Sequence, residues 1–197
     1  MSKILIAVTG GIAAYKIPSV VSVLVDKGHD VKVMMTEAAE KFITPLSFSA
    51  LSHNRVYLDK DHFANDGHIH HIELADWADI IAVAPATYNT ISKIRQNFAD
   101  NLVTSTIAAF TKKVLIFPAM NVNMWKNLIH EEPSVRSQYQ NVQPHVHLRV
   151  RIGGFNNRLT IIYEPAEGKQ ACGAAGPGKL VSTKEIVKLI IQHAKDK

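Results

Sequence analysis

Four short aliphatic runs constrain the fold of this 197-residue chain more than any other feature of its sequence. The first run, Lys3–Val8, is almost entirely Ile, Leu, Val and Ala, with little of the alternation expected of a strand that has one wet face. Such a run predicts a strand buried on both faces, as in a parallel sheet covered by helices. The other three runs are Asp30–Met35, Asp79–Ala84 and Lys113–Phe117.

Helical patterns lie between these runs. An apolar stripe of Ile, Val and Leu residues predicts a helix from Ile12 to the cap residue Gly28, and Pro18 is expected to kink its first turns. A strand, a helix and a second parallel strand are the opening of a doubly wound α/β fold. Further helices are predicted at Pro45–Leu51, Ile91–Gln96, Ala99–Phe110 and Thr183–His193.

Glycine or small polar residues follow each of the four predicted strands. The turn Gly10-Gly11 follows the first strand, and Thr36 follows the second. Thr87 and Asn121 stand in the turns that follow the other two. Because ligands of open α/β sheets bind in the crevice outside the carboxyl ends of the strands, these turns are candidate site segments.

Each of these turns also has a purely structural interpretation. Gly10-Gly11 lacks the full G-x-G-x-x-G spacing, so the pair serves either a tight turn alone or a phosphate bound to free backbone N–H groups. Thr36 at the same edge favours the phosphate, although it also stands where it can cap a short helix that begins near Glu37. The later two turns allow helix capping by Thr87, Asn89 and Thr90, and plain core packing by Met120, Met124 and Trp125.

Composition narrows the class of protein. A content of 47% hydrophobic and 20% charged residues is typical of a globular chain, and the length suits one domain. No apolar run approaches the roughly 20 residues that span a bilayer, and no signal-peptide pattern is present, so we expect a cytoplasmic protein without a membrane partner. The single cysteine, Cys172, cannot form an internal disulfide, which fits a reducing compartment. The net charge of +5 is scattered, which predicts no nucleic-acid face and suits an anionic small ligand equally well.

Two motifs suggest ligands that the sequence does not support. His68, His70 and His71 suggest a metal, but no Cys, Asp or Glu accompanies them at ligand spacing, and strand alternation would place them on different faces. Gly173, Gly178 and Lys179 satisfy G-x-x-x-x-G-K, but Leu stands at the position where a P-loop needs Ser or Thr for magnesium. We therefore predict neither a metal site nor a nucleotide P-loop.

Five motifs together resemble a known family. They are Gly10–Lys16, His71–Leu74, Pro85–Thr90, Pro118–Trp125 and Ala171–Leu180. In this order they resemble the homo-oligomeric flavin-containing cysteine decarboxylases, most closely the bacterial phosphopantothenoylcysteine decarboxylases of coenzyme A biosynthesis. The resemblance implies a single-domain, three-layer Rossmann-like (flavodoxin-like) sheet that binds FMN. It also implies a site completed at a subunit contact of a homotrimer or of a higher assembly of trimers.

The resemblance also implies roles for individual residues. His71 would be the base-like histidine, Asn121 would grip the substrate carboxylate, and Cys172 would protonate a late intermediate. On the cofactor side, Gly10, Gly11, Ile12 and Thr36 would hold the phosphate, and Thr87, Tyr88, Asn89, Thr90 and Ala119 would line the flavin. Met120 and Ala171 would complete the substrate side.

The reaction implied is the conversion of 4'-phospho-N-pantothenoylcysteine to 4'-phosphopantetheine. The flavin oxidises the C–S bond to a thioaldehyde, carbon dioxide leaves, and the enethiolate takes back a hydride from reduced FMN and a proton from a thiol. Lantibiotic-type peptidyl-cysteine decarboxylases stop at the enethiol and lack the cysteine motif that includes Cys172. A flavin prenyltransferase and a catalytically silent flavin-binding regulatory subunit are two further candidate functions.

Some segments depart from the family pattern. Tyr88 replaces a usual small residue beside the flavin, and Arg95-Gln96-Asn97 replaces a small-residue turn. Residues 133–160 form an irregular loop or insertion without clear periodicity, and Ile161–Pro165 is predicted to resume the last strand. The Gly-rich segment 168–182 is predicted to be a flap that closes on the substrate.

Overall fold

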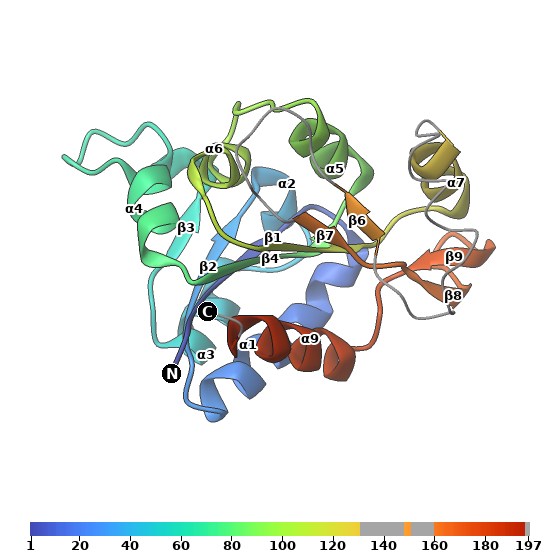
Figure 1. Cartoon of the computed structure of the whole chain (residues 1–197), viewed down its shortest axis with the longest axis horizontal. Coiled ribbons are helices and arrows are strands. Elements are labelled where there is room, and N and C mark those ends of the chain that lie inside the picture. The colour runs from blue at the N-terminus through green and yellow to red at the C-terminus, as the bar shows by residue number, and fades with distance from the viewer. Residues whose placement is uncertain (131–147, 151–159, 196–197) are drawn as a thin grey trace.

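A mostly parallel sheet forms the centre of the molecule. The computed structural model describes residues 1–130, 148–150 and 160–195, and in these ranges the sheet has seven strands in the order β3-β2-β1-β4-β5-β7-β6 (Figure 1). Within this seven-stranded sheet, the β6–β7 pair is antiparallel and the other described pairs are parallel. The strands are β1 Lys3–Val8, β2 Asp30–Met35, β3 Val56–Leu58, β4 Ile80–Ala86, β5 Val114–Pro118, β6 Leu148–Val150 and β7 Thr160–Ile162.

Helices cover both faces of this sheet, which gives the three layers of a doubly wound fold (Figure 1). One face carries the 3-10 turn η1 Ile12–Lys16, α1 Ile17–Asp26, α3 Pro45–Ser52 and α9 Thr183–Lys195. The other carries α4 His70–Trp77, α5 Tyr88–Arg95 and α6 Leu102–Ala109. Two short elements, α2 Glu37–Glu40 and η2 Asp59–Asp61, and the helix α7 Val122–His130 lie beyond strand ends. The predicted fold class is confirmed.

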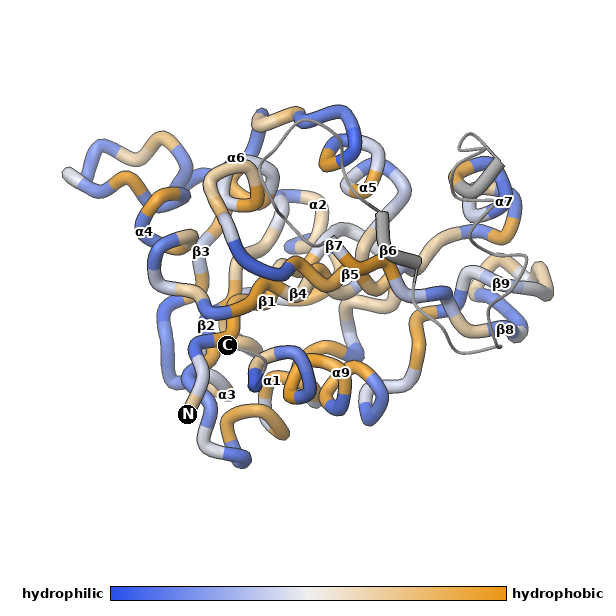
Figure 2. Tube along the Cα trace, viewed as in Figure 1, coloured by the Kyte–Doolittle hydropathy of each residue, from blue (hydrophilic) through white to orange (hydrophobic). Residues whose placement is uncertain are grey.

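Burial on both faces explains why the strands lack alternation. Ile4 and Ile6 of β1 pack into one core cluster, whereas Leu5 and Ala7 pack into the other, and all four are fully buried. Figure 2 shows the hydrophobic residues along the central strands and on parts of α1 and α9, whose buried residues pack into the first of these clusters.

The topology determines where a site can form. β1 pairs with β2 on one side and with β4 on the other, so the chain reverses its winding direction between β1 and β4. Such a topological switch point leaves a crevice outside the carboxyl ends of the two strands. Gly10 and Thr87 follow those two ends.

The structure corrects several predicted boundaries. The helix predicted from Ile12 is a 3-10 turn followed by α1, and Pro18 lies in the first turn of α1, where its missing N–H disrupts no helical hydrogen bond. β4 runs through Pro85 to Ala86, and α5 begins at Tyr88 rather than Ile91. The histidine segment begins α4 rather than a strand.

The C-terminal part combines a hairpin and a helix. α9 begins as predicted, and the Ser182 hydroxyl caps it by accepting the Glu185 N–H at 3.1 Å. The segment predicted as a flap contains an antiparallel hairpin, β8 Ala166–Lys169 and β9 Ala175–Lys179, which projects beside α7 (Figure 1). Most of the predicted loop 133–160 lies outside the described residues. Within the described ranges no helix has both the length and the hydropathy needed to cross a bilayer.

Candidate active site

A cavity of about 830 Å3 opens at the carboxyl ends of β1, β2, β4 and β5. Its volume lies within the range of roughly 300–1,000 Å3 that is typical of small-molecule sites. Every site residue predicted from the sequence lines it except His71: Gly10, Gly11, Ile12, Thr36, Thr87, Tyr88, Asn89, Thr90, Ala119, Met120, Asn121, Ala171 and Cys172.

A buried threonine joins the two strands at the switch point. The Thr9 hydroxyl donates to the Pro85 carbonyl oxygen at 2.6 Å and accepts the Thr87 N–H at 3.0 Å. Thr87 is the N-cap of α5, and its hydroxyl accepts the Thr90 N–H at 3.4 Å. The capping role considered for Thr87 is therefore present, and the same contacts hold Thr87 at the cavity wall.

Close backbone packing surrounds the glycine turn. A Cβ on Gly10 would lie 2.4 Å from the Ala38 Cβ, so only glycine fits where the turn meets α2. Thr36 is the N-cap residue of α2, as predicted, but its side chain makes no capping hydrogen bond. Its buried hydroxyl has no hydrogen-bond partner among the described residues, and Thr36 lines the cavity. A buried hydroxyl without a hydrogen-bond partner is rare and destabilises the fold, and a bound polar group would supply the missing partner.

Sequence reasoning missed an acidic residue at the cavity. One carboxylate oxygen of Asp59 accepts the Glu37 N–H at 2.8 Å, and the other accepts the Leu102 N–H at 3.2 Å. Asp59 thereby ties the first turns of α2 and α6 together beneath the cavity. Asn101, which also lines it, caps α6 by accepting the Thr104 N–H at 2.9 Å. The sequence feature that could have revealed Asp59 is its position directly after the short strand β3, because polar residues also follow the four predicted strands.

The turn after β5 and the hairpin meet at the mouth of the cavity. The Asn121 side chain accepts the Asn123 N–H at 2.8 Å through Oδ1, and its Nδ2 donates to the Cys172 sulfur at 3.4 Å. The backbones are joined as well, because the Met120 N–H donates to the Gly178 carbonyl oxygen at 2.9 Å. The Ala174 N–H and the Asn121 amide donate to the sulfur and lower the pKa of the exposed Cys172 thiol.

The structural interpretation of the Met-Trp motif holds for one residue. Trp125 is buried in the core beneath α7. Met120 is half-buried and Met124 is exposed, and both line the cavity. The motif therefore places Trp125 in the core and Met124 at the site, whereas Met120 lines the cavity and also packs against the core.

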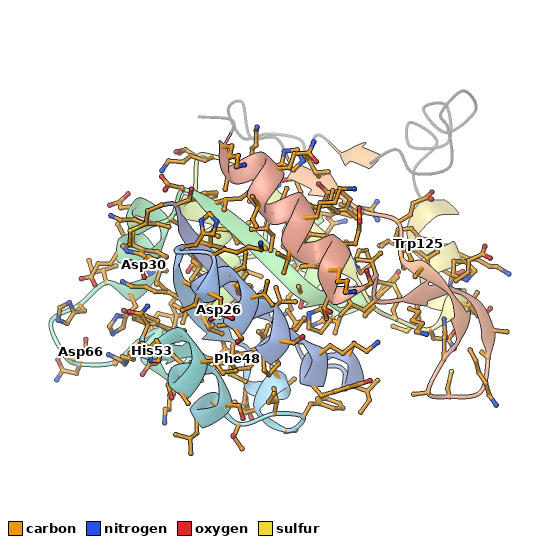
Figure 3. The ribbon with its side chains drawn as sticks, turned by 90° about the horizontal axis from the view of Figure 1, so that it is seen from below. Asp26, Asp30, Phe48, His53, Asp66 and Trp125 are labelled. Carbon is orange, nitrogen blue, oxygen red and sulfur yellow. The ribbon has the colours of Figure 1, made fainter. Side chains whose placement is uncertain are left out.

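His71 does not line the cavity of its own chain. It is half-buried on α4, and its ring meets that of His62 edge to face at 5.2 Å. Burial and His71 lower the pKa of His62. The His71 Nδ1 atom is buried without a hydrogen-bond partner among the described residues. Figure 1 shows α4 and the β8–β9 hairpin at opposite sides of the molecule, and Figure 3 places Asp66, beside α4, far from Trp125.

The other two histidines have carboxylate partners of their own. His70 is buried, and its Nε2 lies 2.8 Å from Asp66. The Nδ1 atom of exposed His68 lies 2.8 Å from Glu73, which raises the pKa of His68. In the described parts of the chain no three His, Cys, Asp or Glu side chains gather as a metal site.

The cavity carries positive charge. Lys16, Lys169 and Lys179 line it, and none of them pairs with a carboxylate in the described ranges. Lys93 also lines it but is paired with Asp100. The arrangement suits a ligand that carries negative charge.

Comparisons with known sequences identify relatives along almost the whole chain. The family model described as Flavoprotein matches residues 1–195. The coenzyme A biosynthesis bifunctional protein CoaBC of Bacillus subtilis is 41% identical over 198 residues, which cover 97% of this chain and 43% of that protein. The protein of the same name from Escherichia coli is 38% identical over 191 residues, covering 97% and 43%. The chain thus spans less than half the length of these relatives.

Comparisons with solved structures agree with the fold. A mutant PPC decarboxylase complexed with pantothenoylaminoethenethiol superposes with a TM-score of 0.75 at 26% identity over 97% of each chain. The FMN binding protein AtHal3 gives a TM-score of 0.74 at 25% identity over 100% of this chain and 98% of that one. The peptidyl-cysteine decarboxylase EpiD shares the fold, with a TM-score of 0.68 at 23% identity over 96% and 98%.

Proposed function

The chain belongs to this flavoprotein family, and from that premise we propose that it is an FMN-dependent phosphopantothenoylcysteine decarboxylase of coenzyme A biosynthesis. Its product would be 4'-phosphopantetheine. The observation that carries the proposal is the 3.4 Å contact between the Asn121 amide and the Cys172 thiol at the mouth of the cavity. The contact supports the proposal because Asn121 would bind the carboxylate and Cys172 would donate the proton, the two functions that decarboxylation followed by protonation requires.

The cavity fits FMN. The unpartnered Thr36 hydroxyl and the first backbone N–H groups of η1 are donors for the phosphate, because the first N–H groups of a helical turn have no partner within the turn. Thr87, Tyr88 and Ala119 line the same cavity and would lie along the ring system. A bound flavin supplies the two-electron redox chemistry that a cysteine carboxylate lacks by itself.

Asn121 would bind and orient the substrate carboxylate. Its Oδ1 already accepts a backbone N–H, and one N–H of Nδ2 points to Cys172. The amide has a second N–H, which remains available for the carboxylate. Met120 and Ala171, at the same rim, would exclude water from the departing carbon dioxide.

Cys172 would donate the proton that completes the product. The two N–H donors that lower the pKa of its thiol also stabilise the thiolate formed after donation. This role distinguishes the proposal from a lantibiotic-type decarboxylase, which releases an unsaturated product. It also requires a reduced thiol, so we place the protein in the cytoplasm, where thiols stay reduced.

His71 would reach the substrate from a second copy of the chain. Its absence from the lining of its own chain's cavity and its buried Nδ1, which has no hydrogen-bond partner among the described residues, support this part of the proposal. Exposed apolar side chains on the same segment, Phe63, Ile69 and Ile72, suit burial against another subunit. So do Ile12 and Tyr15 at the cavity rim. A homotrimer, alone or within a higher assembly, would bring these surfaces together around each site.

Anaerobic incubation with 4'-phospho-N-pantothenoylcysteine tests the proposal. The flavin spectrum and the product mass are followed together, and a peptide ending in cysteine serves as the comparison substrate. We expect saturated 4'-phosphopantetheine and reoxidised flavin with the first substrate only. Turnover of the peptide alone would identify a peptidyl-cysteine decarboxylase. A yellow protein that acts on neither substrate would support a regulatory subunit, and failure to bind FMN would overturn the proposal.

A further inference from the structure

We propose that Gln170 is a positioning residue that holds the Cys172 thiol between the hairpin and the first turn of α7, with its proton directed for donation. The inference rests on the proposed function and adds to it a residue for which the family resemblance gives no role. Gln170 is half-buried at the end of β8 and lines the cavity.

Three side-chain contacts fix the Gln170 amide. Its Oε1 accepts the Val122 N–H at 3.2 Å, and the Cys172 thiol lies 3.7 Å from the same oxygen as a donor. Its Nε2 donates to the Pro177 carbonyl oxygen at 3.2 Å. The opposite amide orientation would set Nε2 against a donor and Oε1 against an acceptor, so the network permits only this one.

The backbone of Gln170 shapes the turn that carries the thiol. The Gln170 N–H donates to the Ala174 carbonyl oxygen at 2.8 Å, and the Gly173 N–H donates to the Gln170 carbonyl oxygen at 2.9 Å. Cys172 is therefore held inside a turn that Gln170 closes from both sides. Gly173 has a φ of +87°, a left-handed conformation that glycine adopts without strain.

A glycine opposite leaves room for the amide. A Cβ on Gly178 would lie 2.4 Å from the Gln170 Nε2 atom and 2.3 Å from the Met120 carbonyl oxygen. The contact between β9 and the turn after β5 is thus shaped around the Gln170 side chain. This packing restricts the amide to the position from which it reaches both Val122 and Cys172.

The contacts supply a partner for each protonation state of the thiol. As a thiol, Cys172 donates to the Gln170 Oε1 atom, and as a thiolate its sulfur accepts from Asn121 and from the Ala174 N–H. In the final step the S–H bond breaks, and its proton passes to one carbon of the enethiol double bond. A bound flavin would supply the hydride for the other carbon, and the thiolate would recover a proton from water.

Two substitutions separate positioning from folding. Gln170→Leu removes the acceptor for the thiol proton and for the Val122 N–H. Gln170→Glu keeps the acceptor, but its carboxylate places a negative charge beside the thiol and cannot donate to Pro177. When protonated, the Glu side chain both accepts and donates, so acidification should restore the native contacts. Glu167→Gln, exposed on β8 outside the cavity, is the matched control.

Alkylation provides a readout that does not depend on activity. Cys172 is the only cysteine of the chain, so iodoacetamide uptake measured by mass reports this thiol alone. A nearby carboxylate disfavours the thiolate, and one pKa unit corresponds to a tenfold change in thiolate. We therefore expect the pH profile of Gln170→Glu to move upward by about one unit. An unshifted profile in Gln170→Glu would overturn the proposal, whether or not the protein proves to be a decarboxylase.

Product partition provides the second readout. In Gln170→Leu, carbon dioxide release should stay within about twofold of wild type, while at least half of the product leaves as enethiol rather than as the saturated thiol. Gln170→Glu should give the same partition at neutral pH and regain saturated product as the pH falls toward the Glu pKa, ~4.3 or higher. A parallel loss of both steps, without rescue by acid, would mean a structural role only. If the wild-type protein releases no carbon dioxide, the proposed function is overturned. The alkylation profile would then still test whether Gln170 positions the Cys172 thiol.

Discussion

The Asn121 amide nitrogen lies 3.4 Å from the Cys172 sulfur, although 51 residues separate the two in the chain. The contact forms because β5 ends at the switch-point edge of the sheet and the β8–β9 hairpin returns to the same edge, where the Met120 N–H bonds to the Gly178 carbonyl oxygen. In the proposed function, the group that would bind the substrate carboxylate thus lies beside the group that would donate the proton. Several predicted effects of substitution depend on this one contact.

Replacement of the thiol should separate the two halves of the reaction. A serine hydroxyl at position 172 is a far weaker acid than the thiol, so Cys172→Ser should bind FMN and release carbon dioxide but fail to complete the reduction. Stopped anaerobic reactions should show accumulated enethiol and bleached flavin. Ser182→Ala, which removes only a helix cap, is the control that should behave as wild type. Saturated product at the normal rate from Cys172→Ser would rule out the proton-donor role.

Asn121 should control the ionisation of the same thiol. Its N–H favours the thiolate and lowers the pKa of Cys172, so Asn121→Leu should raise that pKa. At pH 7 a higher pKa leaves less of the thiol as thiolate, so alkylation by iodoacetamide should become slower. The full pH profile should move to higher pH without a change in its plateau. A profile that stays in place would mean that the Ala174 N–H alone determines the acidity.

His71→Asn should bind FMN normally and release no carbon dioxide, because the base-like group is lost while the cavity is intact. If a second copy supplies the histidine, His71→Asn and Asn121→Leu subunits should complement each other. In co-expressed mixed assemblies half of the cavities keep Asn121 and half of their neighbours keep His71, so about one quarter of the wild-type activity should return. Mixtures that stay inactive, from assemblies shown by mass to contain both variants, would contradict a shared site.

The sequence predicted the sheet well because parallel strands are buried on both faces. Lys3–Val8 and Asp30–Met35 are β1 and β2 with the predicted bounds, since an aliphatic run followed by glycine or threonine leaves little choice of register. The end of β4 was harder to predict. Pro85 donates no hydrogen bond of its own, but Thr9 binds its carbonyl oxygen, and this tertiary contact is invisible in the local pattern.

The site was predicted where residues follow strand ends and missed where they act across the fold. Asp59 was overlooked because its role is to accept N–H groups from two helix starts that are far apart in sequence. Gln170 was overlooked because a polar residue on a solvent-facing hairpin has no local signature. His71 was assigned from a motif, but its side chain does not line the cavity of its own chain, and α4 lies on the opposite side of the molecule from the β8–β9 hairpin.

The glycine turn offers a matched pair of substitutions. A Cβ on Gly10 would lie 2.4 Å from the Ala38 Cβ, whereas a Cβ on Gly11 would meet nothing closer than the Thr87 Cγ2 at 3.7 Å. Gly10→Ala should therefore destabilise the protein by about 1–3 kcal/mol through overpacking, and Gly11→Ala should cost well below ~1 kcal/mol. Urea unfolding measures the free energy of unfolding of both variants, and FMN titration shows whether each still binds the cofactor. Equal stabilities of the two variants would show that α2 moves aside without cost.

The unpaired lysines of the cavity should distinguish a phosphorylated substrate from its dephosphorylated form. Lys179 follows Gly178 at the hairpin and has no carboxylate partner in the described parts of the chain. A phosphate carries close to two negative charges, so Lys179→Gln should raise KM for 4'-phospho-N-pantothenoylcysteine by roughly two- to fivefold, the usual worth of one solvent-exposed ion pair. KM for N-pantothenoylcysteine should stay the same, because that substrate lacks the phosphate.

Added salt screens the interaction between Lys179 and the phosphate. It should therefore weaken the preference of the wild-type protein for the phosphorylated substrate and leave the preference of the variant nearly unchanged. Lys184→Gln on α9, outside the cavity, is the control. An equal rise of KM for both substrates would assign Lys179 to the carboxylate or the flavin, since the cation would then act on a group that the two substrates share.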